Sequence, residues 1–290
     1  EGGVVVLQEN VQRAGDTVTL SADLSDNDNI RPMGQDFRLG DTLPAPRILT
    51  PRDIGLLASM NVAQVHASRR PVVAVIATGD ELVMPGETPA EGQIICSNSY
   101  ALAALIEAAG GEARILPIAR DREASLRLVF DLAASADLIV TSGGASVGDH
   151  DLVGKVATDL GLERAFWKIA MRPGKPLMAG HIGGTPMLGL PGNPVSALVC
   201  AELFLKPLLG VMLGVDLTPK PIEAVLGEAV AATGPRTHYM RARVEAGVIM
   251  PFRNQDSALL GIMTQSNALL IRLQGDGPRA IGETVTYLAL

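Results

Sequence analysis

Four short segments of the chain hold the residues best suited to chemistry. The first contains a hydroxyl, a glycine and two carboxylates: Thr78, Gly79, Asp80 and Glu81. The second is rich in glycine, serine and aspartate: Ser142, Gly143, Gly144, Ser146, Gly148, Asp149 and Asp151. Its glycines let main-chain amides approach an anion, its serines add hydroxyl donors, and its two aspartates could hold a cation.

The third and fourth segments combine prolines with polar or charged groups. One places three cations around a stiff turn: Lys168, Arg172, Pro173, Gly174 and Lys175. The other is a tight loop ahead of an apolar stretch: Pro191, Gly192, Asn193, Pro194 and Ser196. A cationic cluster in a chain of negative net charge indicates an anionic ligand.

Each segment also has a purely structural interpretation. The carboxylates could be solvated acids in an ordinary turn, the glycines a plain loop, and the cations solvated surface charge. The fourth segment could be a strand-to-helix corner with Ser196 near the helix cap. Taken together, the four predict a pocket for a phosphorylated or otherwise anionic small molecule, with carboxylates able to hold Mg²⁺.

The elements that must position these segments alternate along the middle of the chain. We expect strands at 72–77, 113–118, 137–140 and 165–170, and helices at 97–109, 122–134 and 151–160. Unbroken apolar strands alternating with amphipathic helices predict an α/β fold with a doubly wound, mostly parallel sheet covered on both faces. Ligands bind such sheets beyond the carboxyl ends of the strands, where these segments fall.

Both flanks of this region are strand-like. In residues 1–46, the β-branched run at 4–7 and the alternating residues 16–20 predict strands, and residues 25–29 a turn. A short helix should follow Thr50, because a threonine cap, Pro51 at the first helical position and Asp53 mark a helix start. Alternating runs at 222–230, 239–248, 269–273 and 284–288 predict a small C-terminal β domain.

Composition excludes several classes of function. The 290 residues carry 24 Lys and Arg against 31 Asp and Glu, a net charge of −7, so the broad positive field of a nucleic-acid binder is absent. Aromatic residues are 3%, too few for base-stacking platforms. Two isolated cysteines and four scattered histidines disfavour a zinc site or a redox dithiol and fit a reducing, cytoplasmic compartment. Glu202, Lys206 and Pro207 interrupt the apolar stretch 195–215, so we expect no membrane span.

The four segments, in this order and spacing, resemble the molybdopterin molybdenumtransferases, the molybdenum-insertion enzymes related to the E domain of gephyrin. The resemblance runs over nearly the whole chain. It extends upstream to residues 30–36, which end in Asp36, and downstream to residues 263–269. The chain opens at Glu1 without an initiator Met, and the family's N-terminal segment is expected to be missing.

The resemblance implies a cytoplasmic homodimer of several domains. These are a β-rich segment at 1–46, a helical linker at 47–69, a molybdopterin- and nucleotide-binding α/β domain at 70–217 and a C-terminal β-barrel at 218–290. The family acts on adenylylated molybdopterin and molybdate with Mg²⁺, inserts molybdenum and releases AMP. A molybdopterin adenylyltransferase is the expected delivering partner.

The resemblance also assigns roles to residues. Catalytic groups match Asp36, Glu81, Asp121, Asp151, Lys168 and Arg172, and Mg²⁺ is assigned to Glu81, Asp121 and Asp151. Molybdate is assigned to Lys175, Ser196, Arg236 and Ser257. The remaining residues of the four segments are expected to bind the organic substrate: Thr78, Gly79, Asp80, Ser142, Gly143, Gly144, Ser146, Gly148, Pro173, Gly174, Pro191, Gly192, Asn193 and Pro194. Arg172 stands where the family has a lysine, and Asp149 where it often has Glu.

Two other functions compete with metal insertion. A scaffold paralogue would not need the acidic residues and Lys175 together. A molybdopterin adenylyltransferase would not need a C-terminal β domain or the group of Arg236 and Ser257. The sequence therefore favours the molybdenum-inserting enzyme over both.

Overall fold

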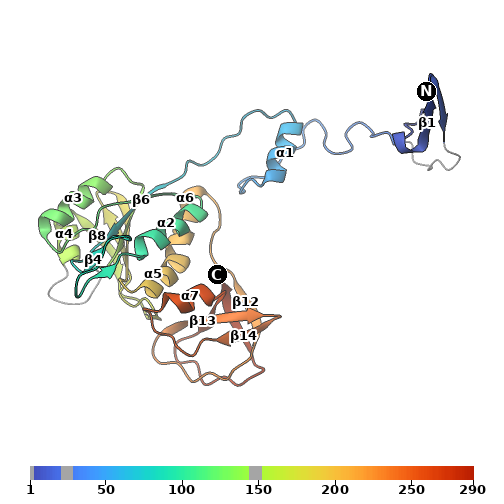
Figure 1. Ribbon diagram of the computed structural model, residues 1–290. Coiled ribbons are helices and arrows are strands. Elements are labelled where there is room, and N and C mark those ends of the chain that lie inside the picture. Colours follow the sequence, from blue (N-terminus) through green and yellow to red (C-terminus); the bar gives the residue numbers. More distant parts are fainter. Residues whose placement is uncertain (1–2, 21–28, 144–151) are drawn as a thin grey trace. The chain divides into compact units, whose positions relative to one another are not determined.

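The computed structural model describes residues 3–20, 29–143 and 152–290 of the chain (Figure 1). Residues 25–28 of the turn predicted at 25–29 and the second half of the glycine-rich segment, including Gly144, Ser146, Gly148, Asp149 and Asp151, therefore lie outside the described residues. The chain divides into two compact units, Glu1–His66 and Ala67–Leu290. Each unit is described by itself below.

The first unit contains a small hairpin and one helix. A short 3₁₀ turn η1 (Gln8–Asn10) leads into strands β1 (Val11–Ala14) and β2 (Thr17–Leu20), which pair antiparallel. The strand expected at residues 4–7 is wrong: this run is irregular, and Val4 and Val5 are exposed, so no packing surface favours an extended ladder there.

The expected helix follows as α1 (Pro51–Ser59). Its first turn is a capping box, in which the Thr50 side chain accepts from the Asp53 amide and the Asp53 carboxylate accepts from the Thr50 amide. The Asp53 carboxylate accepts from the amide and from the hydroxyl of Thr50, and these two bonds lower the pKa of Asp53, with a smaller contribution from Arg47. The cap predicted from three residues is therefore confirmed.

The second unit begins with a six-stranded sheet in the order β6-β3-β7-β11-β10-β8. Strands β3 (Val72–Ala77), β6 (Glu112–Ile115), β7 (Leu138–Ser142) and β11 (Thr185–Leu190) are parallel. Strands β10 (Met178–Ile182) and β8 (Leu162–Trp167) extend the sheet antiparallel. The sheet is thus mostly parallel, as predicted, with an antiparallel edge.

That edge corrects one detail of the sequence interpretation. The strand expected at 165–170 begins three residues earlier as β8 and does not continue the parallel alternation. The reason is a tight turn at Gly183 and Gly184, which folds β10 back onto β11 as a hairpin. A hairpin forces antiparallel pairing, and β8 then pairs antiparallel with β10.

Helices cover both faces of the sheet (Figure 1). Helices α3 (Glu123–Ala133) and α4 (Leu152–Asp159) pack on one face, where Leu126, Phe130 and Val156 are buried. Helices α2 (Asn98–Ala108) and α5 (Pro194–Cys200) pack on the other, where Leu102 and Val199 are buried. This arrangement explains why the central strands are apolar on both sides.

A continuous apolar helix crosses the second core. It comprises α5, the π-helical turn η2 (Ala201–Leu205) and α6 (Lys206–Leu213). Residues Pro194–Leu213 are long and apolar enough to span a membrane by length and composition, but half of that window is buried inside the protein. Its apolar side chains are therefore used in packing against the sheet, as in a core helix.

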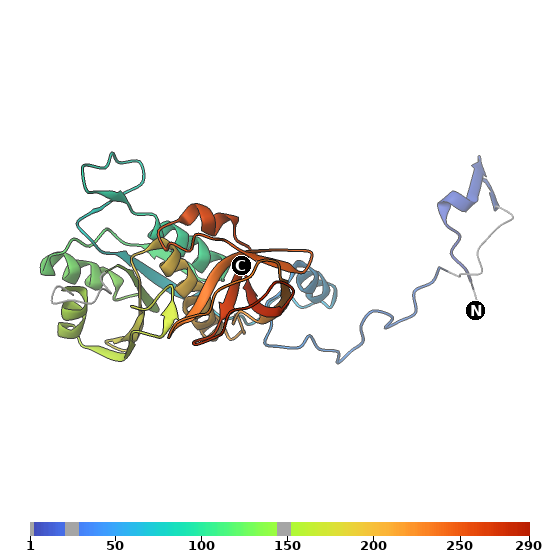
Figure 2. The same cartoon turned by 90° about the horizontal axis from the view of Figure 1, so that it is seen from below.

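The C-terminal part is a closed five-stranded β-barrel (Figure 2). Its strands are β12 (Pro221–Leu226), β13 (Thr237–Glu245), β14 (Val248–Pro251), β15 (Ala268–Arg272) and β16 (Thr284–Ala289). Pairing of β14 with both β12 and β13 closes the ring. The short strand β9 (Met171–Arg172) pairs with β13, so the cationic turn that follows β9 starts at the barrel.

The barrel confirms the predicted C-terminal β domain and adds two elements. The run expected as one strand at 239–248 is split, because the chain turns at Ala246 and Gly247 and returns as β14. A short helix α7 (Leu260–Gln265), which the sequence pattern did not indicate, lies between β14 and β15 and contacts α5.

Candidate functional site

A cavity of about 810 Å³ opens at the carboxyl ends of strands β3 and β7. We call it the strand-end cavity. Its lining brings together residues from three of the four predicted segments with Asn98 at the start of α2 and Asp121 ahead of α3; the residues of the segments are Thr78, Gly79, Glu81, Ser142, Gly143, Pro191, Gly192, Asn193, Pro194 and Ser196. Its size suits a large organic ligand, since ligand cavities measure roughly 300–1,000 Å³.

The acidic wall of this cavity is held by a backbone clamp. The Arg120 guanidinium Nη1 donates to the carbonyl oxygens of Gly79, Asp80 and Leu82 at 3.4, 3.1 and 2.9 Å. The Asp121 amide donates to Asp80 Oδ1 at 3.1 Å. These bonds fix the turn after β3 against the turn after β6, and they place Glu81 and Asp121 in one cavity.

Gly79 is required where the turn begins. Its φ is +143°, and a Cβ at this position would lie 2.4 Å from Glu81 Oε2. The Glu81 carboxylate therefore folds over the bare backbone of Gly79, a close approach that only glycine permits without rearrangement.

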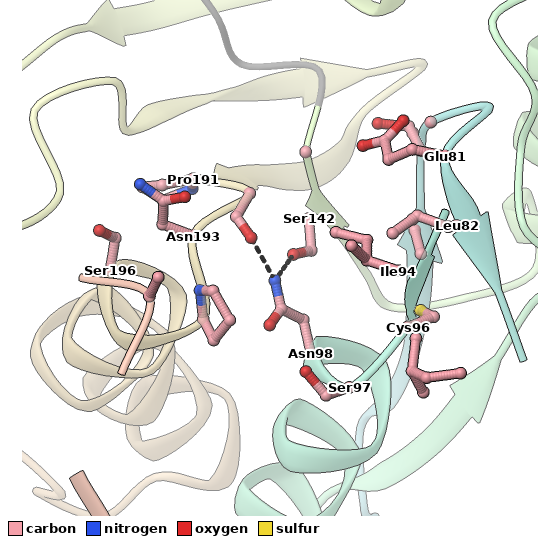
Figure 3. Close-up of a pocket in the computed structure, with 18 of the residues that line it drawn as sticks. Glu81, Leu82, Ile94, Cys96, Ser97, Asn98, Ser142, Pro191, Asn193 and Ser196 are labelled. Atoms are coloured by element: carbon pink, nitrogen blue, oxygen red, sulfur yellow. Dashed lines mark hydrogen bonds between the residues drawn. The ribbon is translucent and has the colours of Figure 1, made fainter. Parts of the chain in front are cut away.

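Asn98 holds the opposite wall (Figure 3). Its amide Nδ2 donates to Ser142 Oγ at 2.8 Å and to the Gly192 carbonyl oxygen at 2.7 Å. One side chain at the start of helix α2 thus ties the end of β7 to the loop of residues 191–194. We call residues 191–194 the proline loop.

A second cavity, of about 760 Å³, lies between the cationic turn and the barrel. Four cationic side chains line it, and we call it the basic cavity: Arg172, Lys175, Arg236 and Arg253. Ser196, Ser257, His238 and Gln255 add polar groups, and Asp256 is its carboxylate. Such a lining suits a compact anion, because guanidinium and ammonium charges and hydroxyl donors surround one space.

His238 shows how positive this region is. Burial lowers the pKa of His238, and the charges of Arg172, Arg241, Arg236 and Arg272 lower it further, to about 4. The imidazole is therefore neutral at pH 7, and it can donate one hydrogen bond and accept another in the basic cavity without adding charge.

The two cavities adjoin and share Pro176 and Ser196. They are also connected by hydrogen bonds, because Asn193 Nδ2 donates to Ser257 Oγ at 3.0 Å and the Val195 amide donates to the Ser257 carbonyl at 3.0 Å. Asn193 lines the strand-end cavity and Ser257 the basic cavity. A ligand in one space therefore lies next to a ligand in the other.

The structure gathers most of the site residues expected from the sequence. All four residues assigned to molybdate line the basic cavity: Lys175, Ser196, Arg236 and Ser257. Glu81 and Asp121 line the strand-end cavity. Arg172, predicted as catalytic, lines the basic cavity, and so do Pro173 and Gly174, which were predicted to bind the organic substrate.

Two expected catalytic residues that the structure describes, Lys168 and Asp36, are not in these linings. Lys168 has its ammonium 3.8 Å from the centre of the Trp167 ring, a cation–π contact at the sheet edge. Trp167 is 37% exposed and is therefore not a core residue of the sheet. Asp36 belongs to the first unit, whereas both cavities are formed by the second. Asp151 lies outside the described residues.

Sequence reasoning missed several lining residues. Asn98, His238, Arg253 and Gln255 were not selected because each stands outside the four segments. Asn98 had a usable signal, since it is a polar residue at the start of an apolar helix that follows a strand. The other three reach the site only through the closure of the barrel.

The carboxylates of the strand-end cavity suit a hard cation such as Mg²⁺ in donor type. Among the residues that the structure describes, no group of three or more His, Cys, Asp or Glu side chains is arranged to hold a metal ion. Glu81 and Asp121 are the two carboxylates in the described lining of this cavity, a number typical of Mg²⁺ that also binds a substrate phosphate and waters.

Comparisons with known families match the two parts of the second unit separately. Residues 74–210 match the family described as a probable molybdopterin binding domain. Residues 223–290 match the MoeA C-terminal region, domain IV. The first match covers the sheet and its helices, and the second covers the barrel.

Whole proteins of the same kind are similar over most of this chain. The molybdopterin molybdenumtransferase of Haemophilus influenzae is 37% identical over 97% of this chain and 72% of its own length. Molybdopterin molybdenumtransferase 2 of Mycobacterium tuberculosis is 36% identical over 88% of this chain and 65% of its own length. The crystal structure of the molybdopterin biosynthesis MoeA protein of Pyrococcus horikoshii matches 99% of this chain and 72% of its own, with a TM-score of 0.77 and 28% identity.

Proposed function

The chain belongs to the molybdopterin molybdenumtransferase family, enzymes of molybdenum cofactor biosynthesis, and from this premise we propose that it inserts molybdenum from molybdate into adenylylated molybdopterin with release of AMP. The observation that carries the proposal is the pair of adjoining cavities. One, of about 810 Å³, contains carboxylates and small polar groups, and the other, of about 760 Å³, is lined by four cations. A large phosphorylated pterin and a small oxyanion need two such spaces side by side.

The basic cavity is the proposed molybdate site. Molybdate is a tetrahedral dianion, and Lys175 and Arg236 supply charge while Ser196 and Ser257 supply hydroxyl donors. Arg172 lines the same cavity, so the change from the lysine of the family keeps the charge there. The Arg172 guanidinium adds a planar fork of donors in place of a single ammonium.

The strand-end cavity is the proposed site for the organic substrate. Its hydroxyl, amide and glycine groups can bind the pterin and the nucleotide: Thr78, Gly79, Asn98, Ser142, Gly143, Gly192 and Asn193. The proline loop closes the side that faces the basic cavity, where Asn193 contacts Ser257. The dithiolene of the substrate would then reach molybdate across Ser196, which lines both cavities.

The carboxylates form the proposed catalytic edge. Glu81 and Asp121, with Asp151 from the segment outside the described residues, would hold Mg²⁺. Mg²⁺ would screen the negative charge of the phosphoanhydride when bound. The role of this chain is to hold the turns after β3 and β6 together through the clamp of Arg120 and the Asp121 amide, so that the carboxylates of Glu81 and Asp121 line one cavity. Asp36 and Lys168 remain proposed catalytic residues without a place in either cavity.

The proposed reaction consumes one adenylylated molybdopterin and one molybdate. A water molecule attacks the AMP phosphorus, the bond from that phosphorus to the bridging oxygen of the phosphoanhydride breaks, and AMP leaves while the bridging oxygen stays on the molybdopterin phosphate. The two dithiolene thiolates displace two oxygens of molybdate, which leave as water after protonation. In cells we propose a cytoplasmic homodimer that receives its substrate from a molybdopterin adenylyltransferase.

The test is AMP release from adenylylated molybdopterin with Mg²⁺, measured with and without molybdate. The assay uses the 290-residue chain and a chain extended at its N-terminus to the length of its relatives. Asp121→Asn should reduce molybdate-dependent release by about a hundredfold, a size typical for loss of one charged catalytic group. Asp131→Asn, at an exposed position of helix α3, is the matched control and should leave the rate unchanged.

Three results would contradict the proposal. A folded, dimeric extended chain that releases no AMP would favour a scaffold. ATP-dependent adenylylation of molybdopterin without molybdate would favour an adenylyltransferase. Equal rates of AMP release with and without molybdate would separate nucleotide cleavage from metal insertion.

A further inference from the structure

Arg241 is a buried arginine that lines neither cavity and yet is bonded to the loop that forms the wall of the basic cavity. It lies in the middle of strand β13 and is 2% exposed. Its amide and its guanidinium Nε both donate to Gln255 Oε1, at 2.9 and 3.3 Å. Its Nη1 donates to the Asp256 carbonyl oxygen at 2.8 Å.

The loop returns these bonds. Gln255 Nε2 donates to the Arg241 carbonyl at 2.9 Å and to the Phe252 carbonyl at 2.6 Å. The Phe252 amide donates to the Arg241 carbonyl at 3.0 Å. These bonds hold residues 252–256 against Arg241 of β13. The position of Arg241 therefore sets the path of the loop.

The loop leads directly to Ser257. The Ser257 carbonyl accepts from the Val195 amide, and its hydroxyl accepts from Asn193 Nδ2, both at 3.0 Å. Ser257 thus stands between the barrel and the proline loop, on the wall of the basic cavity. A shift of the loop would move this hydroxyl and the Asn193 contact together.

An arginine is the residue suited to this place. Burial lowers the pKa of Arg241, and the charge of Asp256 opposes that shift. A buried cation is tolerated only when its donors are satisfied, and the planar guanidinium can reach Gln255 and Asp256 at once. Lysine would retain the charge but would have one donor centre for two separated acceptors.

We propose that Arg241 is a positioning residue for oxyanion binding, whose guanidinium fixes residues 252–257 so that the Ser257 hydroxyl lies on the basic cavity and against Asn193. The inference rests on the proposed function, because molybdate is taken as the oxyanion.

The experiment measures molybdate binding to the full 290-residue chain by equilibrium dialysis. Arg241→Lys should weaken molybdate binding by about tenfold, the effect of about 1.4 kcal/mol. Arg243→Lys is the matched control, because Arg243 lies two residues further along β13 and pairs with Glu245 at the surface. It should change the affinity by less than about twofold.

A double-mutant cycle tests whether Arg241 acts by positioning Ser257 or through its own positive charge on the anion. In the Ser257→Ala background, Arg241→Lys should have less than about a twofold effect, because the group that it positions has been removed. Equal effects of Arg241→Lys in both backgrounds would mean that the arginine acts on the anion independently of Ser257, and the proposal would be overturned.

Gln255→Met provides a second route, since Gln255 is half-buried and this substitution adds no charge to the basic cavity. The variant loses the acceptor for Arg241 and the two bonds donated by Nε2, so we expect weakening of about threefold. Circular dichroism verifies the fold of each variant. Unchanged affinity in the folded variants, with binding by the unchanged chain, overturns this inference alone. No molybdate binding by the unchanged chain overturns the proposed function and the inference with it.

Discussion

The two cavities are built in different ways, although they share a wall. The strand-end cavity is formed by turns that directly follow parallel strands, and its groups are near one another because the strands are. The basic cavity is formed where a turn after β9 meets a loop of the barrel, so its cations come from positions up to 81 residues apart, from Arg172 to Arg253. One cavity follows from sheet topology and the other from the docking of two parts.

This difference separates two tasks. Carboxylates and small donors in the first cavity fit an extended phosphorylated substrate, whereas clustered cations in the second fit a compact oxyanion. Keeping opposite charges in adjoining spaces avoids their mutual neutralisation, as they would pair if they faced each other directly. Substitutions in one cavity should therefore affect one substrate more than the other.

The largest effect is expected for Glu81→Gln in the strand-end cavity. Removing this charge should reduce molybdate-dependent AMP release by about a hundredfold, because Glu81 would no longer help to hold the Mg²⁺ that would screen the phosphoanhydride. Molybdate affinity, measured by dialysis, should stay within about twofold. Glu107→Gln at an exposed position of α2 is the control. A large loss of molybdate affinity would show that the cavities do not divide the substrates.

Lys175→Ala should give the opposite pattern. Loss of one charged donor in the basic cavity should weaken molybdate binding by about thirtyfold, which corresponds to roughly 2 kcal/mol. Binding of the nucleotide substrate, followed by fluorescence or calorimetry, should change little. Lys220→Ala removes a surface lysine paired with Asp216 and should leave both affinities unchanged. Equal loss of both ligands would contradict separate sites.

Gly174→Ala should destabilise the wall of the basic cavity by about 1–3 kcal/mol. Its φ is +107°, and a Cβ there would lie 2.4 Å from the sulfur of Cys200, which is fully buried. Urea unfolding measures the change. Adding Cys200→Ala should recover part of the loss, because it removes the clash and leaves the backbone strain. No recovery would mean that the strain alone accounts for the effect.

Asn98→Ala should have a smaller effect, of about 1–2 kcal/mol on unfolding, because two hydrogen bonds to Ser142 and Gly192 are lost. The KM for the nucleotide substrate should rise several-fold while kcat changes less, since the proline loop would lose its tie to the sheet. Ser59→Ala, which removes one exposed hydrogen bond in α1, is the control. An unchanged KM would separate Asn98 from the shape of the cavity.

The smallest effect concerns pH. The pKa of His238 is lowered from 6.5 to about 4, so the unfolded chain binds more protons than the folded one between these values. The contribution of His238 to stability is therefore complete above pH 6.5 and is lost as the pH falls toward 4. The unchanged chain should lose more stability between pH 7 and pH 5 than His238→Gln, as measured by urea unfolding. Equal losses would mean that burial and the four arginines do not hold this imidazole neutral.

Local patterns predicted local structure well. The helix start at Thr50, Pro51 and Asp53 was readable because a capping box needs only neighbouring residues. The apolar run at β3 was readable because a strand buried on both faces has no polar side. The run at residues 4–7 misled, since β-branched residues favour a strand only where something packs on them.

The same limit applies to the site. The turn of Gly79 and Glu81 was found because glycine and carboxylates directly follow a strand. His238, Gln255 and Arg253 could not be found, because nothing in their neighbours distinguishes them from ordinary strand and loop residues. Lys168, a conspicuous lysine beside the cationic turn, lies on the Trp167 ring and lines neither cavity, so its catalytic role stays a prediction.

The sequence by itself determined the order of the elements, the α/β character of the central sheet and which polar segments fall at strand ends. It did so because hydrophobic periodicity and capping act over a few residues. Only the tertiary structure decided that Ser257 meets Asn193, that Arg241 holds the loop between them and that four distant cations line one cavity. Those contacts depend on how a closed barrel docks against a sheet, and short-range pattern carries no information about that docking.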